Sequence, residues 1–529
     1  MTAGQVWLVG ALAVPAVGAA VVALTPARAD RAARLVGAGF AAVTLLLLIL
    51  LGVHDRDLGW VSYGSATGPP PVLPWHQVDL PWVPGLDLRF HLGVDGISYP
   101  LVVLTGLLTL LCCAYTVRRA PAHSSGRALV ALLLVIEVGM LGTFLALDLV
   151  LFFVFFEVVL LPMYAVIAGW GGDREMPRQY AGDVMPRPSD AAQRAAARKF
   201  ALYTLFGSVL LLVGVFVVVA AAGTGDIVAL TGGTGLTRTT QLVAFTLLAL
   251  AFAVKSPLWP LHSWLPDAHT QAPTVGSVIL AGVLLKMGTY GLIRIGVGVT
   301  PEGARWAAPV LGVLAVAAIL IGALVCLAQD ELKRLIAYSS VGHMGFVLLG
   351  IATLTGTGIQ AALIGNVAHG VITGLLFFLV GGLKDRAHTG ALADLGGLRE
   401  TAPRLAGLLA FAAVASLGLP GLAGFWGEAF AVVAAIDRGG ALWVTLGVLA
   451  AIGGALTAAY FLRLLRRVTH GPAAPAVRGL GPRLAGVEWV AWAPLVLLAL
   501  AVGLVPTLVL GFAGDPVRAL LEAAGGGSR

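Results

Sequence analysis

The chain has 529 residues and a formal net charge of +7, yet only 11% of its residues are charged. Average soluble proteins carry roughly 25% charged residues. Here 59% of the residues are hydrophobic and the mean hydropathy is +0.94. So few polar groups cannot cover the surface of a soluble fold of this length. The composition therefore excludes soluble, disordered and disulfide-rich classes, and it predicts a chain solvated mainly by lipid.

Fourteen apolar runs are long enough to cross a bilayer, because a spanning helix needs roughly 20 mostly apolar residues. Continuous apolar runs, rather than alternating ones, favour helices over the strands of a barrel. The sequence therefore predicts an all-α polytopic membrane protein. The expected helices cover residues 3–24, 31–53, 97–117, 127–146, 149–170, 200–222, 241–262, 272–296, 306–328, 335–353, 360–383, 403–434, 441–464 and 488–512.

The distribution of cations predicts the orientation of these helices. Of the 33 Lys and Arg residues, 23 lie in alternate loops, beginning with the loop between the first two helices, and 8 lie at the termini or in the other loops. The positive-inside rule places the cation-rich loops in the cytoplasm and both termini outside. Topology thus accounts for the positive charge, and we expect no binding of nucleic acid.

Ionisable residues inside the predicted helices are the strongest functional signal. A charge at the bilayer centre costs about 2.5–3.5 kcal/mol on insertion scales, so such residues need a compensating role. Histidine, and lysine or glutamate whose charged form is disfavoured by burial, can gain and lose a proton near neutral pH. A series spread over seven helices predicts a proton relay; a structural Lys255–Glu157 pair is the alternative. The set is Glu137, Glu157, Lys255, Lys286, His343, His369 and Glu428.

Two of these helices have broken patterns. Three prolines follow Lys255 in the helix at 241–262, and a glycine- and proline-rich stretch precedes Glu428 in the helix at 403–434. Proline opens the helical hydrogen-bond ladder, and broken helices in corresponding places of two halves mark transporter sites. The sequence therefore predicts two inverted five-helix repeats, with the seventh and twelfth helices broken. The expected divisions are residues 1–126, 127–296 (first repeat), 306–470 (second repeat) and 471–529.

Several motifs resemble the antiporter-like subunits of respiratory complex I. The stretch from Lys255 to His269, which reads KSPLWPLHSWLPDAH, is similar to the signature of their seventh helix. LKRLIAYSS at 332–340 resembles the signature of their tenth helix, and the segment at 90–98 and the phenylalanine-rich run into Glu157 fit as well. The resemblance covers about residues 90–470. Glu428 stands where the relatives generally carry lysine, which is similar to the chain M branch, the equivalent of mitochondrial chain 4.

The resemblance implies a role for most members of the ionisable set. Glu157 would modulate Lys255 as an ion pair, Lys286 would be the central relay, and His343 and His369 would pass protons to Glu428. Glu137 matches no motif of the family, and its place in the relay rests on burial alone.

The resemblance also implies the setting of the chain. Its partners would be other membrane subunits of complex I in a bacterial plasma membrane. NADH, FMN, iron–sulfur clusters and quinone would bind in other subunits, and we expect no metal or cofactor in this chain. Two alternatives stay open, namely a subunit of an Mrp-type cation/proton antiporter and a passive membrane scaffold.

Overall fold

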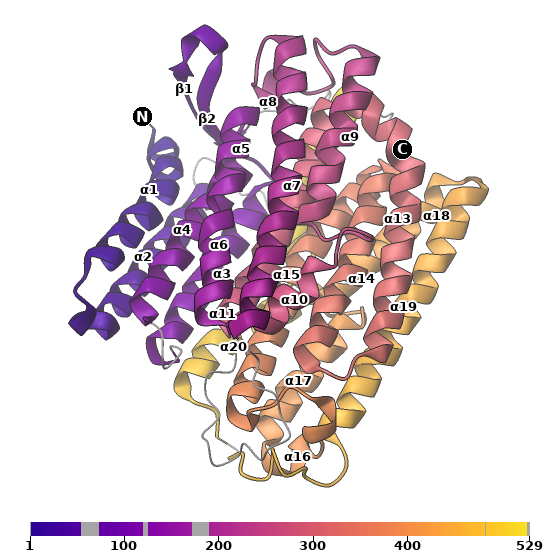
Figure 1. Ribbon diagram of the computed structural model, residues 1–529. Coiled ribbons are helices and arrows are strands. Elements are labelled where there is room, and N and C mark those ends of the chain that lie inside the picture. The colour runs from indigo at the N-terminus through magenta and orange to yellow at the C-terminus, as the bar shows by residue number, and fades with distance from the viewer. Residues whose placement is uncertain (1, 54–73, 120–124, 172–189, 482, 526–529) are drawn as a thin grey trace.

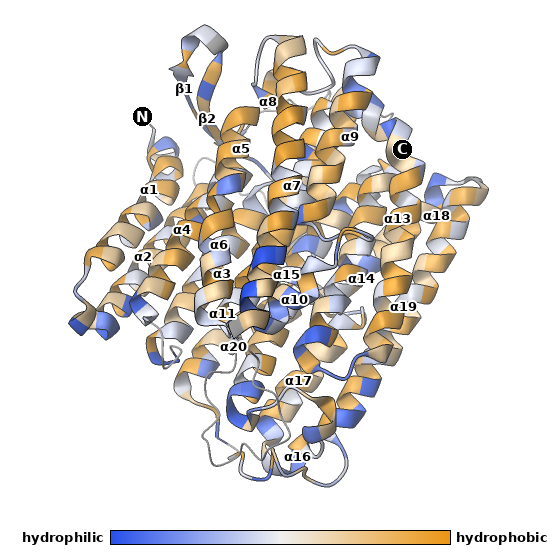
Figure 2. Ribbon diagram, in the orientation of Figure 1, coloured by the Kyte–Doolittle hydropathy of each residue, from blue (hydrophilic) through white to orange (hydrophobic). Residues whose placement is uncertain are grey.

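The computed structural model describes residues 2–53, 74–119, 125–171, 190–481 and 483–525. Long helices run side by side through it (Figure 1), and 13 of the described helices are long and apolar enough to cross a membrane. Hydrophilic positions gather at helix ends and in connecting loops (Figure 2). Large apolar side chains such as Leu161, Leu202 and Leu497 are exposed, as expected where lipid is the solvent. The predicted all-α membrane fold is confirmed.

The N-terminal part contains three long helices and a hairpin that the sequence analysis did not predict. The hairpin lies within the long loop at 54–96, and its strands pair antiparallel with His76 opposite Val94. The elements are α1 (Ala3–Leu24), α2 (Asp30–Val53), β1 (His76–Val83), β2 (Leu88–Val94) and α3 (Tyr99–Arg118).

The next part includes the first predicted repeat. Two π-helical segments, Leu280–Leu284 and Leu292–Val297, flank the short helix α12. The helices are α4 (Gly126–Leu145), α5 (Leu149–Val158), α6 (Leu160–Trp170), α7 (Asp190–Ala222), α8 (Ile227–Leu230), α9 (Arg238–Lys255), α10 (Trp264–Gln271), α11 (Thr274–Ile279) and α12 (Leu285–Gly291).

The last part includes the second predicted repeat and the C-terminal helices. The predicted helix at 488–512 ends earlier, at Leu504, and the chain turns at Pro506 into a separate helix. The helices are α13 (Pro301–Ala328), α14 (Leu332–Thr353), α15 (Gly356–Ala387), α16 (Leu398–Thr401), α17 (Pro403–Ser416), α18 (Gly424–Arg438), α19 (Gly440–Thr469), α20 (Gly486–Leu504) and α21 (Thr507–Ala523).

Both predicted helix breaks are present. The first separates α9, which ends at Lys255, from α10, and the second separates α17 from α18. In the second break Gly418 and Gly421 have φ values of 69° and 89°. These left-handed conformations are open to glycine at little cost, which explains why the break is rich in glycine. The inverted relation of the two repeats and the division of the chain at their ends stay predictions.

Candidate functional site

Lys286 lies at the centre of the candidate site and is fully buried on α12. Its Nζ donates a hydrogen bond to the carbonyl of Ala281, which belongs to the preceding π-helical segment. The same Nζ lies 2.6 Å from Nδ1 of His369 on α15. Such π segments are frequent at functional sites. The two predicted residues Lys286 and His369 are therefore in direct contact, within one proton-transfer distance.

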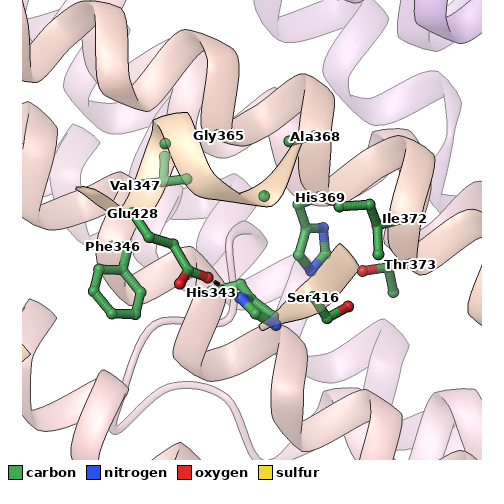
Figure 3. Close-up of a pocket in the computed structure, with 12 residues that line it drawn as sticks. His343, Phe346, Val347, Gly365, Ala368, His369, Ile372, Thr373, Ser416 and Glu428 are labelled. Atoms are coloured by element: carbon green, nitrogen blue, oxygen red, sulfur yellow. Dashed lines mark hydrogen bonds and ion pairs between the residues drawn. The ribbon is translucent and has the colours of Figure 1, made fainter. Parts of the chain in front are cut away.

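His369 and His343 face a common cavity. Their ring centroids are 5.8 Å apart, and the Nε2 atom of each is buried with no hydrogen-bond partner among the described residues. The cavity has a volume of 30 Å³ and is also lined by the hydroxyl-bearing residues Thr373 and Ser416 (Figure 3). A water molecule needs about 10–15 Å³ of such volume and two to four polar partners. The cavity is therefore suited to hold water between the two imidazoles.

Glu428 completes the chain of ionisable side chains. Its Oε1 lies 2.7 Å from Nδ1 of His343, and the two side chains point toward one another at the cavity (Figure 3). This contact depends on the close approach of α18 to α15, because a Cβ on Gly427 would lie 2.5 Å from the Cα of Gly365. The absence of side chains at these two positions thus brings Glu428 to the cavity. Lys286, His369, His343 and Glu428 form one connected series.

Lys255 and Glu157 are neighbours but do not form the expected ion pair. Lys255 is 3% exposed, and its Nζ lies 4.6 Å from the centroid of the Phe156 ring. In the described part of the chain, no carboxylate lies within 4 Å of this ammonium group. Glu157 instead accepts a hydrogen bond from the hydroxyl of Ser208 on α7. In this structure a hydroxyl on a third helix binds the Glu157 carboxylate, and the role of Glu157 as the ion-pair partner of Lys255 stays a prediction.

The helices that carry the two lysines are in tight contact. The hydroxyl of Ser256, the residue after Lys255, donates a 3.2 Å hydrogen bond to the carbonyl of Leu285, the residue before Lys286. A Cβ on Gly288 would lie 2.2 Å from the same hydroxyl oxygen. The end of α9 therefore lies directly against the start of α12.

Glu137 stands apart from the series. It is fully buried on α4, and among the described residues neither of its carboxylate oxygens has a hydrogen-bond partner. No recorded hydrogen bond or ion pair joins it to the other predicted members in the described chain. The structure thus gives Glu137 the burial expected of it and no contact with the relay.

Two buried groups were not among the predicted site residues. Arg294, which lies near the end of the predicted helix at 272–296, is 4% exposed in the second π segment and forms an ion pair with Asp95. His269 is fully buried and stacks on Phe377 with centroids 4.4 Å apart, and both of its ring nitrogens lack a partner among the described residues. His269 lies within the KSPLWPLHSWLPDAH motif, so the motif itself was the signal for it.

A helical membrane bundle with two broken helices and a buried lysine–histidine–glutamate series defines an antiporter-like membrane protein. Comparison with known proteins gives the particular family. Residues 184–453 match the family described as NADH:quinone oxidoreductase/Mrp antiporter, TM, and the chain belongs to this family.

Relatives with curated names are similar along most of their length. The chain is 37% identical to NAD(P)H-quinone oxidoreductase chain 4 3 of Trichormus variabilis, with 95% of this chain and 89% of the relative covered. It is 38% identical to NADH-quinone oxidoreductase subunit M of Rhodobacter capsulatus, with 91% and 94% covered. The predicted resemblance to the chain M branch is confirmed by these relatives.

Solved structures show the same fold. A chain of respiratory complex I from Thermus thermophilus matches with a TM-score of 0.82 and 30% identity, over 98% of this chain and 100% of that one. A chain of the Mrp complex from Dietzia sp. matches with a TM-score of 0.81 over 99% and 100%, at 24% identity. The second match shows the fold alone.

Proposed function

We propose that the chain is the chain M-type, proton-translocating membrane subunit of a bacterial NADH:quinone oxidoreductase. The observation that carries the proposal is the connected series from Lys286 to Glu428 across the cavity. The names of the relatives at 37% and 38% identity support the same assignment. The complex as a whole is the enzyme, and this chain contributes a proton path.

Proton transfer along the series needs few movements. The Lys286 ammonium group gives a proton to Nδ1 of His369 over 2.6 Å. An imidazole that accepts a proton at one nitrogen can release one from the other, so Nε2 of His369 passes a proton through water in the cavity to Nε2 of His343. Nδ1 of His343 then gives its proton to Oε1 of Glu428 over 2.7 Å.

The first half sets the charge that drives the transfer. Like charges repel strongly in a dry interior, so a proton on Lys255 disfavours a proton on Lys286 one helix away. Loading Lys255 therefore pushes the Lys286 proton toward His369. In this scheme Glu157 controls Lys255, because its carboxylate stabilises the charged lysine whenever the two are in contact.

The setting of the chain follows from the same proposal. Its partners are the other membrane subunits of the complex in the bacterial plasma membrane, with both termini on the outer side. NADH, FMN, iron–sulfur clusters and quinone belong to those other subunits. The alternative function, a subunit of an Mrp-type cation/proton antiporter, shares the matched family and the fold, whereas the curated relatives named above are quinone oxidoreductase subunits.

Purification of the chain from its native membrane tests the proposal. Under the proposed function, a tagged chain co-purifies with flavin- and iron–sulfur-containing subunits that oxidise NADH, and Lys286→Ala lowers proton uptake into inverted vesicles driven by NADH. Co-purification with antiporter subunits alone, together with sodium-dependent proton movement that needs no NADH, contradicts it.

A further inference from the structure

Glu157, Ser208 and Lys255 meet where α5, α7 and α9 come together. Ser208 is 5% exposed, and the residue before it packs tightly against α9, because a Cβ on Gly207 would lie 3.2 Å from the Cβ of Val254. Val254 directly precedes Lys255. The hydroxyl of Ser208 is therefore held beside the first helix break, within reach of the Glu157 carboxylate.

The Ser208 hydroxyl has one proton and two acceptors. One is Oε1 of Glu157, and the other is the carbonyl oxygen of Thr204, one turn earlier on α7, at 2.9 Å. A hydroxyl donates one hydrogen bond at a time, and serine in a helix commonly donates to the carbonyl four residues earlier. Rotation of the hydroxyl from the carboxylate to the carbonyl leaves the serine satisfied and frees Glu157.

Among the described residues, Lys255 forms no ion pair within 4 Å, although the Glu157 carboxylate is near enough to attract its charge. Its ammonium group lies over the ring of Phe156, the residue that precedes Glu157 on α5. A buried charge without a counter-ion is costly. Glu157 directly follows Phe156 on α5, so its carboxylate is the natural partner of the Lys255 ammonium group. While the Glu157 carboxylate accepts the hydrogen bond from Ser208, it is not paired with Lys255.

We propose that Ser208 is a positioning residue that switches the Glu157–Lys255 pair between open and closed arrangements. With the hydroxyl on Glu157, the lysine lacks its counter-ion and readily gives up its proton. With the hydroxyl on the Thr204 carbonyl, Glu157 turns to Lys255 and holds it charged. This inference rests on the proposed function, because it assigns Ser208 a part in the same proton path.

Three variants of the assembled complex test the switch. Ser208→Ala removes the donor, so the pair stays closed and NADH-driven proton uptake falls about tenfold, in line with the strength of a hydrogen bond to a charged group. Ser208→Thr keeps the hydroxyl and retains most of the uptake. The matched control is Thr246→Val on α9, whose hydroxyl donates to the carbonyl of Leu242 four residues earlier and takes no part in the switch; its uptake stays at the parental level.

A structure of the Ser208→Ala complex gives a readout that loss of packing alone would not produce. We expect the Glu157 carboxylate within 4 Å of the Lys255 ammonium group. If Ser208→Ala does not assemble, Ser208→Cys replaces it, because a thiol is a weak donor and the same closure is expected.

The outcomes separate this inference from the proposed function. Parental uptake in Ser208→Ala, equal losses in Ser208→Ala and Ser208→Thr, or an unmoved Glu157 overturns the switch. If Lys255→Ala loses uptake while Ser208→Ala does not, the switch alone fails. If Lys255→Ala also pumps like the parent, the proposed function itself fails.

Discussion

Each half of the molecule places an ionisable pair at a helix break, and the residue at the break has the opposite charge in the two halves. In the first half a carboxylate, Glu157, lies near a lysine at a helix break, and in the second half a histidine, His343, lies beside a glutamate at a helix break. The second pair is in contact at 2.7 Å, whereas in the first pair the carboxylate accepts a hydrogen bond from Ser208. We therefore propose that the first half controls the timing of the transfer and the second half carries it.

The sign of each charge agrees with its place relative to the break. Lys255 is the last residue of α9, and Glu428 lies in the second turn of α18, which begins at Gly424. A helix C-terminus carries partial negative charge and an N-terminus partial positive charge, each worth about 0.3–1 kcal/mol to a suitable ion. The effect falls off within a turn, so it favours Lys255 more than Glu428. Each break thus presents the helix end that suits its own ionisable group.

The largest effect is expected at the junction of the two halves. Lys286→Ala removes the side chain that contacts both the carbonyl of Ala281 in the π segment and His369. Because alanine cannot carry a proton, pumping driven by NADH should fall at least about tenfold. Lys286→Arg, which stays charged, should fall as far. Proton uptake by assembled complexes in inverted vesicles measures both, and parental uptake in either variant would separate Lys286 from the path.

A smaller effect is expected in the first half. Glu157→Gln removes the charge that controls Lys255, and we predict a sharp but incomplete loss of uptake, about threefold to tenfold. Glu157→Asp keeps the charge on a shorter side chain and should be milder. If both variants pump like the parent, the first half has no control function and the proposed difference between the two halves is wrong.

The smallest effect is expected at Glu137. Its carboxylate is buried without a partner in the described structure and contacts no member of the series. Because a neutral amide of the same shape meets the same surroundings, Glu137→Gln should change proton uptake less than about twofold. A loss as large as that of Glu157→Gln would add Glu137 to the path and extend the first half toward α3 and α4.

The sequence predicted the features that follow from composition along the chain. A charged residue within an apolar run can be recognised from the sequence alone, so Lys255, Lys286 and Glu428 were predicted. Proline and glycine mark the breaks for the same reason. Arg294 lies near the end of the predicted helix at 272–296, where a cation is commonly solvated, so the sequence did not mark it as a site residue although it is buried against Asp95.

Contacts between distant segments could not be predicted from the sequence. Whether Glu157 binds Ser208 or Lys255 depends on side-chain rotamers and on the packing of α5, α7 and α9. Neither can be read from the periodicity of the sequence. The same holds for the cavity between the two histidines, which is lined in part by Gly365 on α15 and Gly427 on α18 where these helices approach closely. The hairpin and α21 were missed because short elements at the ends of membrane helices resemble loops in composition.

Glu428 offers the most direct test of the central claim that a proton crosses from Lys286 to the second half and leaves through this residue. The measurement is NADH-driven proton uptake into vesicles by the assembled Glu428→Gln complex. Glutamine preserves shape but cannot accept and release a proton, so the account predicts that most coupled uptake is lost, whereas Glu428→Lys, which restores an ionisable group, retains part of it. Parental pumping by an assembled Glu428→Gln complex would contradict the account.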